Sequence, residues 1–204
     1  MILISIEGNI GVGKSTVLSR VRAAFEGDPR IVVVDEPVEL WKERGLLQAV
    51  YNKSLSATVF QQVAIASRVG AIGRATRDPS IEVVISERSP FSDKHVFAAS
   101  NITGIDDVAY QVSFEDVMSL LPEFSERKFL ILRADLNTVS SRIAGRSREA
   151  ERGIERSYLQ SIDDAHMRFA DIFFDDTVVI DAQDTSDVVV DRVLEEIRAV
   201  LQRA

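Results

Sequence analysis

The sequence predicts an α/β fold in which five parallel strands form a sheet flanked by helices. Short apolar, β-branched segments recur along the chain with helical patterns between them. This alternation is typical of parallel strands joined by crossover helices. Val32–Val34 and Val83–Ile85 are apolar without interruption, which indicates strands buried on both faces of the sheet. No repeat or linker breaks the pattern, so we expect a single domain over residues 1–204.

The expected strands and helices alternate along the chain. The strands are expected at Ile2–Ile6, Ile31–Val34, Ile81–Ser86, Lys128–Arg133 and Thr177–Asp181. Helices are expected at Lys14–Phe25, in one or two pieces between Glu39 and Val50, and at Thr58–Arg77, Phe91–Ser100, Val112–Leu121, Leu136–Ala144, Arg156–Phe169 and Ser186–Arg203. Either Thr185 or Ser186 is the expected N-cap of the last helix.

Composition narrows the classes of protein. Apolar residues make up 46% and charged residues 27%, as in ordinary globular proteins. No apolar run approaches the ~18 residues of a membrane span, and the first residues read as a strand and not as a signal peptide. The chain has no cysteine, which favours a cytosolic or organelle-matrix setting, and we expect the cytoplasm. Its net charge of −8 argues against binding to nucleic acids or anionic membranes.

A phosphate-binding loop follows the first strand. The segment fits the pattern G-x-x-x-x-G-K-[ST] and consists of Gly8, Asn9, Ile10, Gly11, Val12, Gly13, Lys14 and Ser15. Its glycines let backbone N–H groups converge on a phosphate at a helix N-terminus. We expect Lys14 to reach the β- and γ-phosphates and to face solvent without ligand, Ser15 to bind Mg²⁺, and Thr16 to contact the α-phosphate.

GTP-dependent switches share this loop, but their other motifs are missing. No Asp stands three residues before any of the ten glycines, and Asn52-Lys53 is followed by Ser54-Leu55 and not by x-Asp. The sequence therefore disfavours a GTP-dependent switch or regulatory module, while an ATP-dependent switch or binding module stays as a less favoured alternative.

Two carboxylates follow predicted strands, where ligands of open α/β sheets bind. Glu36 comes after the second strand and Glu87 after the third, with Arg88 beside it. A kinase that acts on a hydroxyl group needs a carboxylate to accept the proton and another near Mg²⁺. The alternative is that these strand-end charges are merely solvated.

An arginine cluster lies in the second half of the chain. In an acidic protein, such a cluster suggests a clamp for phosphate oxygens, and Gly145 and Gly153 would let it move as a lid. The alternative is a cationic helix end balanced by neighbouring glutamates. The arginines are Arg142, Arg146, Arg148 and Arg152.

Several short sequence blocks occur in this chain in the same order and at about the same spacing as in one protein family. They are residues 7–16, Glu36-Pro37-Val38 with Trp41, Phe60-Gln61, Glu87-Arg88-Ser89 with Ser92-Asp93, and residues 142–153 followed by Tyr158-Leu159. Together they resemble the deoxynucleoside kinase family, which includes deoxycytidine, deoxyguanosine and mitochondrial thymidine kinases. The resemblance implies a P-loop kinase fold with an arginine-rich lid, ATP as phosphate donor, Mg²⁺, a deoxynucleoside acceptor and a homodimer.

The resemblance also implies roles for individual residues. Glu36 would be the base near the 5′-hydroxyl with Arg88 close by, and Glu87 would sit at the metal, although the base role stays open between the two. The nucleoside would meet Trp41, Tyr51, Phe60, Gln61, Phe97 and Glu151. The transferred phosphoryl group would meet Arg142, Arg146 and Arg148, and the donor adenine would lie near Gln183, Asp184 and Thr185.

Base preference depends on two further positions. Arg68 lies seven residues after Gln61, and Asp93 six after Glu87. In the family, an Arg–Asp pair here accompanies cytosine or purine deoxynucleosides, whereas thymidine-preferring members carry apolar or small residues. We therefore expect deoxyadenosine, deoxyguanosine or deoxycytidine to be favoured over thymidine. The alternative is an ordinary helix Arg and a helix-start Asp.

A nucleoside monophosphate kinase of thymidylate type is the second enzyme hypothesis, because it shares the fold and the loop. It would need basic residues to hold the phosphate of its acceptor, where this chain offers Glu36 and aromatic residues. His95 and His166 have no partners at metal-ligand spacing, and we expect them to be ordinary helix residues.

Overall fold

The computed structural model describes residues 1–146 and 154–203. In these residues a parallel sheet has the strand order β2-β3-β1-β4-β5. The predicted five-stranded parallel sheet is thus confirmed. Its strands are β1 (Ile2–Gly8), β2 (Ile31–Val34), β3 (Val83–Glu87), β4 (Glu126–Arg133) and β5 (Thr177–Asp181).

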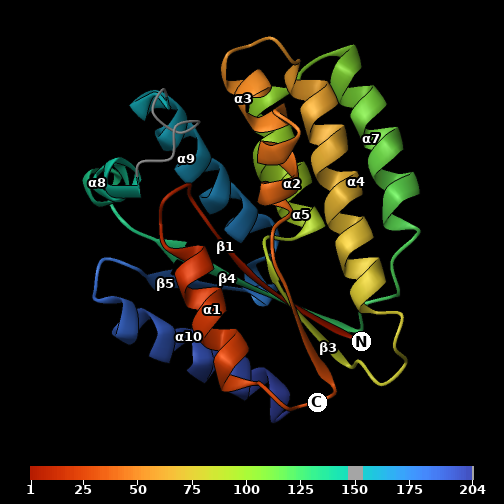
Figure 1. Cartoon of the computed structure of the whole chain (residues 1–204), viewed down its shortest axis with the longest axis vertical. Helices are drawn as coiled ribbons and strands as arrows, with labels where there is room; N and C mark the ends of the chain where they lie inside the picture. The colour runs from red at the N-terminus through yellow and green to blue at the C-terminus, as the bar shows by residue number, and fades with distance from the viewer. Residues whose placement is uncertain (147–153, 204) are drawn as a thin grey trace.

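Helices cover both faces of the sheet (Figure 1). On one face, α1 (Lys14–Ala24) packs against α10 (Ser186–Leu201). On the other face lie α4 (Ala57–Ala75) and α9 (Arg156–Ile172), and α7 (Ile105–Met118) packs against α4. Ile2, Ile4 and Ile6 of β1 face α1 and α10, while Leu3 packs toward α4. Burial on both faces follows from this alternation.

The segment between β2 and α4 folds as two short helices. They are α2 (Val38–Glu43) and α3 (Leu46–Tyr51). Gly45 separates them with φ 70°, a left-handed conformation that glycine adopts without strain. The helical segment expected between Glu39 and Val50 in one or two pieces thus consists of two helices.

The segment of the predicted helix Phe91–Ser100 is helical throughout, but the helix type differs from the prediction in its middle. The chain forms α5 (Pro90–Ser92), the π-helical segment η1 (Asp93–Ala98) and α6 (Ala99–Asn101). A π-helical turn widens the helix, and such turns occur often at functional sites. Helix α7 begins at Ile105, seven residues before the predicted Val112, because Gly104 starts the helix.

Smaller differences concern helix ends. Helix α8 (Leu136–Arg146) runs two residues further than predicted. Helix α9 ends at Ile172 and not at the predicted Phe169, and a 3-10 turn, η3 (Phe174–Asp176), follows it. Helix α10 ends at Leu201, and Thr185 is its N-cap but makes no side-chain cap hydrogen bond. Ends of this kind vary by a residue or two because terminal turns lack internal partners.

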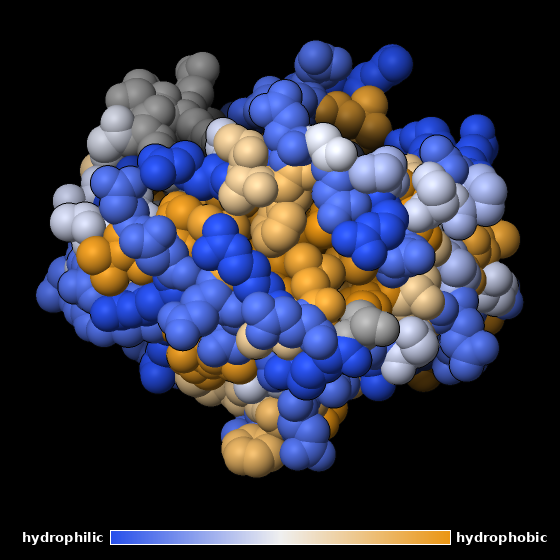
Figure 2. Space-filling model, turned by 90° about the horizontal axis from the view of Figure 1, so that it is seen from below, coloured by the Kyte–Doolittle hydropathy of each residue, from blue (hydrophilic) through white to orange (hydrophobic). Residues whose placement is uncertain are grey.

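The carboxyl ends of the strands form one edge of the sheet. In the sheet, β1 lies between β3 and β4. The chain runs from β1 to β2 on one side and later crosses from β3 to β4 on the other side of β1, and ligands of such sheets bind at this reversal of direction. Among the described residues, no helix combines the length and the apolar character needed to cross a membrane. Figure 2 shows the molecule from below, with hydrophilic side chains over most of that face and hydrophobic ones between them.

Candidate active site

The phosphate-binding loop joins β1 to α1 at the carboxyl edge. Gly8 has φ 127°, and a Cβ placed on it would lie 2.3 Å from the carbonyl oxygen of Leu132 on β4. Only glycine fits there. Gly11 and Gly13 also have positive φ angles, 79° and 115°. The loop therefore turns sharply before helix α1 begins at Lys14.

The side chain of Lys14 folds back onto the loop. Its Nζ donates hydrogen bonds to the carbonyl oxygens of Gly8 and Asn9, at 3.2 and 2.9 Å. Lys14 is buried, so the prediction of a solvent-facing lysine is wrong. Burial and the nearby charge of Arg88 lower the Lys14 pKa to about 7, although the carboxylates of Glu87 and Glu36 oppose this.

Glu36 and Arg88 meet beside the loop. Glu36 follows β2, and its Oε1 lies 3.2 Å from Nε of Arg88. Arg88 also donates from Nη1 to the carbonyl oxygen of Gly8, at 2.9 Å. Arg88 has φ 62°, a left-handed conformation that costs a non-glycine residue energy and recurs at functional sites.

Burial pushes the pKa of Glu36 upward, but the charges of Arg88 and Arg68 outweigh it and lower the pKa. The carboxylate is therefore ionised at neutral pH and able to accept a proton.

Glu87 is the last residue of β3, and Oγ of Ser15 donates to its Oε1 at 3.2 Å. The two oxygens thus come from the first turn of α1 and the end of β3. Mg²⁺ prefers oxygen ligands and often uses only one or two protein carboxylates, with phosphates and water completing its shell. Ser15 and Glu87 fit this ligand chemistry.

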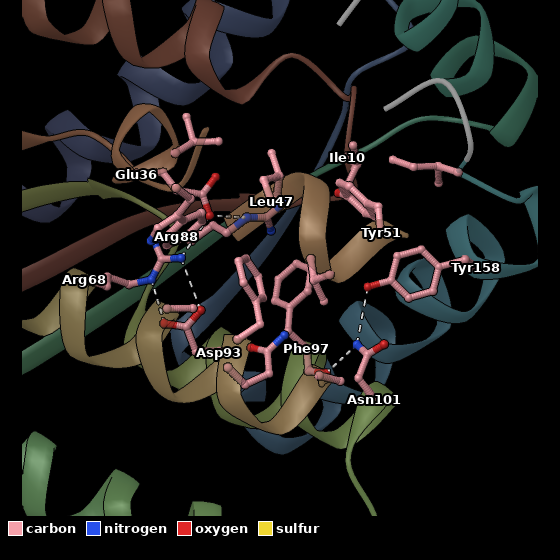
Figure 3. A pocket seen from close by; sticks show the side chains of 18 of the residues that line it. Ile10, Glu36, Leu47, Tyr51, Arg68, Arg88, Asp93, Phe97, Asn101 and Tyr158 are labelled. Carbon is pink, nitrogen blue, oxygen red and sulfur yellow. Dashed lines mark hydrogen bonds and ion pairs between the residues drawn. The ribbon is translucent and has the colours of Figure 1, made fainter. Parts of the chain in front are cut away.

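Arg68 binds the carboxylates of Asp93 and Glu36 at the pocket (Figure 3). Its Nε and Nη2 donate to the two oxygens of Asp93, at 2.6 and 3.2 Å. Nη2 also donates to Glu36 at 2.9 Å, and Nη1 to the carbonyl oxygen of Glu87 at 2.8 Å. Burial alone would lower the Arg68 pKa, but Asp93 and Glu36 raise it. The guanidinium therefore stays charged.

A cavity of about 590 Å³ opens from these charged groups. Trp41 and Phe60 meet edge to face with ring centroids 5.4 Å apart, and the Arg88 guanidinium lies 4.5 Å from the centroid of Phe97. Oε1 of Gln61 is buried without a hydrogen-bond partner, so it is available to a ligand. Of the predicted nucleoside-binding residues, the cavity is lined by Glu36, Trp41, Tyr51, Phe60, Gln61, Arg68, Arg88, Asp93 and Phe97.

The predicted lid and donor-base residues come from α8, from the sequence that follows it, and from the segment after β5. Arg142 donates from Nη1 to the carbonyl oxygen of Val12, at 3.0 Å, so α8 contacts the phosphate loop. Arg146 is the last residue of α8, whereas Arg148, Arg152 and Glu151 lie outside the described residues. Gln183, Asp184 and Thr185 form an exposed turn between β5 and α10, where Asp184 pairs with Arg192 at 2.8 Å.

Asn101 and Tyr158 are among the polar residues of the cavity that sequence reasoning missed. Nδ2 of Asn101 lies 3.3 Å from the Tyr158 hydroxyl and 2.7 Å from the carbonyl oxygen of Phe97. Tyr158 comes five residues after the arginine-rich segment ends at Gly153 and belongs to a block of the resemblance, which was the available signal. Asn101 ends α6, and nothing in its local sequence marks it.

The expectation for the two histidines holds only for His95. His95 packs against Phe169 and Phe173 in an aromatic cluster. His166 is buried, and its Nε2 lies 3.2 Å from the backbone N of Gly8. It therefore belongs to the surroundings of the phosphate loop and is no ordinary helix residue.

Together, a glycine-rich phosphate loop at the switch point of a parallel sheet, a buried lysine and strand-end carboxylates define a P-loop phosphotransferase. Comparison with known proteins narrows the class. The family model described as deoxynucleoside kinase matches residues 4–202. The chain therefore belongs to the deoxynucleoside kinase family, whose members are ATP-dependent phosphotransferases, and it is an enzyme of this kind.

Curated relatives and solved structures agree with this. A probable deoxycytidine kinase of fowlpox virus (strain NVSL) is 31% identical over 172 residues, which cover 81% of this chain and 70% of the relative. The deoxycytidine kinase of Rattus norvegicus is 32% identical, with 80% of this chain and 73% of the relative covered. A deoxyadenosine kinase from M. mycoides, solved with the products dCMP and dCDP, has TM-score 0.75 at 20% identity over 97% of this chain and 99% of its own.

Proposed function

We propose that the protein transfers the γ-phosphoryl group of ATP to the 5′-hydroxyl of deoxyadenosine, deoxyguanosine or deoxycytidine in preference to thymidine. The observation that carries this preference is the buried Arg68–Asp93 pair, which lines the cavity together with Gln61. A charged, hydrogen-bonding edge suits an exocyclic amine or a purine N7 and leaves little room for the thymine methyl group. A site with buried polar groups disfavours analogues that leave those groups unpaired.

Each group has a chemical role in this proposal. Glu36 accepts the proton of the 5′-hydroxyl, whose oxygen bonds to the γ-phosphorus as the bond from that phosphorus to the β-γ bridging oxygen breaks and ADP leaves. Lys14 and Arg88 offset the charge on the phosphate oxygens. Ser15 and Glu87 would hold Mg²⁺, which neutralises charge on the phosphates when bound.

The predicted lid and donor-base contacts complete the proposed site. Arg142, Arg146 and Arg148 would contact the transferred phosphoryl group, and Glu151 together with Tyr51 would hold the 3′-hydroxyl. The turn Gln183–Thr185 follows a strand at the carboxyl edge of the sheet, where a donor adenine would lie beside α1. A cytoplasmic location and a single domain over residues 1–204 remain part of the proposal.

The experiment is a phosphorylation assay with labelled ATP and each of the four deoxynucleosides and their monophosphates. We expect product from deoxyadenosine, deoxyguanosine and deoxycytidine, less from thymidine, and none from the monophosphates. Phosphorylation of monophosphates alone would favour the thymidylate-type kinase. Hydrolysis of ATP without any acceptor would contradict the proposal.

We also propose a homodimer, as the family resemblance implies. Helix α7 carries an exposed apolar stripe formed by Ile105, Val108 and Val112, with exposed fractions of 79%, 56% and 58%. These residues are spaced by three and four positions and therefore share one face of the helix. A second copy of this chain that presents the same stripe would cover it across a two-fold axis.

A further inference from the structure

Three consecutive peptide groups at the start of the phosphate loop are held by side chains. The Gly8 N–H faces Nε2 of His166 at 3.2 Å. The Gly8 carbonyl oxygen accepts from Arg88 and Lys14. The Ile10 N–H donates to Oδ1 of Asn9 at 2.8 Å, while Nδ2 of Asn9 donates to the carbonyl oxygen of Leu159 at 2.8 Å. Helix α9 therefore contacts the loop at two points, His166 and Leu159.

The hydrogen bonds of His166 define its tautomer. Its Nδ1 lies 2.8 Å from the carbonyl oxygen of Ile162. A carbonyl oxygen can only accept, so Nδ1 carries the hydrogen. Nε2 is then unprotonated, which is the form that accepts from the Gly8 N–H. Burial, with the charge of Arg88, lowers the His166 pKa to about 3, so the ring stays neutral at physiological pH.

We propose that His166 is a positioning residue for the phosphate loop, holding the Glu7–Gly8 peptide group in the orientation that shapes the donor-phosphate site. The inference rests on the proposed function, because that loop is the proposed binding site for the ATP phosphates. Gly8 is packed tightly against Leu132, so its N–H has little room to find another acceptor. Without His166 the loop must either bury an unpaired N–H or change shape.

The opposing explanation is that His166 merely fills the core next to Phe97, whose ring centroid lies 6.1 Å away. Two substitutions separate the explanations. In His166→Gln, the side-chain amide oxygen is as many bonds from Cβ as Nε2 is, so it can accept from Gly8. In His166→Asn, the amide group reaches only as far as Nδ1, so it can pair with Ile162 but not with Gly8.

The measurement is steady-state kinetics, first with ATP varied at saturating deoxynucleoside and then with the deoxynucleoside varied at saturating ATP. We expect His166→Asn to lower kcat/KM for ATP at least about tenfold, as an unpaired buried N–H implies. We expect His166→Gln to stay within roughly threefold of wild type, and KM for the deoxynucleoside to change less than about threefold in both variants.

A matched control is Phe169→Leu, which weakens the core under the same helix, one turn further on, without reaching the loop. It should lower thermal stability and leave kcat/KM for ATP unchanged below the melting temperature. Equal losses in the Asn, Gln and Phe169→Leu variants would overturn the proposal, because stability alone would then explain them.

A second test leaves His166 itself unchanged. The chain has two histidines, so the imidazole ¹⁵N signals that remain in the His95→Gln variant belong to His166. We expect His166 to show a protonated Nδ1 and an unprotonated Nε2 from pH 5 to 8. A protonated Nε2 in the free enzyme would overturn the proposal. If the wild type phosphorylates no deoxynucleoside, the proposed function fails instead, whatever the histidine spectrum shows.

Discussion

Lys14 combines a positive charge with nearly complete burial. Among the residues that the structure describes, its ammonium group donates hydrogen bonds only to two backbone carbonyl oxygens, and its strongest charge repulsion comes from Arg88. The fold therefore disfavours the protonated form, and a bound triphosphate would favour it. The same lysine that the proposed reaction needs in its charged form thus makes the free protein less stable at neutral pH.

The pH dependence of stability tests this description of Lys14. Its pKa falls from 10.5 to about 7 on folding, so between these values the unfolded chain binds the extra proton. Stability should then rise with pH between pH 7 and 9, by up to about 1 kcal/mol per pH unit from this group. Urea unfolding of wild type and Lys14→Met at pH 7, 8 and 9 isolates the contribution, because the difference between the two curves should shrink or reverse as the pH rises.

The same variant has an effect on activity. Lys14→Met removes the charge from the donor-phosphate site but keeps much of the side-chain volume. We expect kcat/KM to fall by well over about tenfold, a loss of more than ~1.4 kcal/mol in transition-state stabilisation. Turnover close to wild type would show that Lys14 does not contact the donor phosphates, and an unchanged pH profile of stability would show that it is not buried as a charge.

Glu36 and Glu87 both lie at strand ends, and a pair of substitutions separates their roles. Glu36→Gln keeps the hydrogen-bonding shape but cannot take a proton. We expect kcat to fall by at least about a hundredfold while ATP affinity stays nearly constant. Glu87→Gln should instead raise the Mg²⁺ concentration needed for half-maximal rate. Wild-type kcat in Glu36→Gln with an inactive Glu87→Gln would assign the base role to Glu87.

At the scale of the elements, α7 supports the proposed dimer through its exposed stripe. Val108→Glu with Val112→Glu places two charges on that face, which two copies cannot bury together without a large desolvation cost. We expect the variant to be monomeric in light scattering at concentrations where the wild type is dimeric. Phe174→Glu is the matched control, since Phe174 is 79% exposed in η3, away from α7. A monomeric wild type, or a dimeric double variant, would contradict the proposal.

The elements also show what sequence patterns can and cannot predict. All five strands are predicted because their apolar side chains are buried in the sheet. Helix α7 is predicted too short because it has apolar residues on two faces. Ile105 and Val108 point to solvent, while Tyr110 and Phe114 are buried, so the apolar residues do not follow the spacing of a helix with one buried face. The π-helical turn η1 depends on packing against α4 and α9, which no local pattern encodes.

The candidate site was predictable where chemistry is local in sequence. The glycine-rich loop, Glu36 and Glu87 lie at the ends of strands, and the family resemblance adds Arg68 and Asp93. His166 could not be predicted, since its partner Gly8 lies 158 residues away. The burial of Lys14 likewise depends on Arg88 and Glu36, which are brought close only by the order of the strands.

At the scale of the whole molecule, Arg68 joins parts of the chain that are distant in sequence. Its guanidinium contacts Glu36 after β2, the backbone of Glu87 on β3, and Asp93 in η1. The residues that would read the base are thus bonded directly to those that would perform the chemistry. Substrate choice and rate are therefore expected to change together when this pair is altered.

Replacing the pair tests the proposed base preference. Arg68→Met with Asp93→Ala should open space for the 5-methyl group of thymidine and raise the ratio of kcat/KM for thymidine to that for the other three deoxynucleosides. Because Glu36 also loses a hydrogen bond from Arg68, we expect kcat to fall for every substrate, so the ratio is the quantity to measure. Each single variant should raise the ratio less and should lower stability more, by roughly 3–5 kcal/mol, since it leaves one buried charge without its partner. A wild type that prefers thymidine, or a double variant with an unchanged ratio, would show that the pair stabilises the fold without selecting the base.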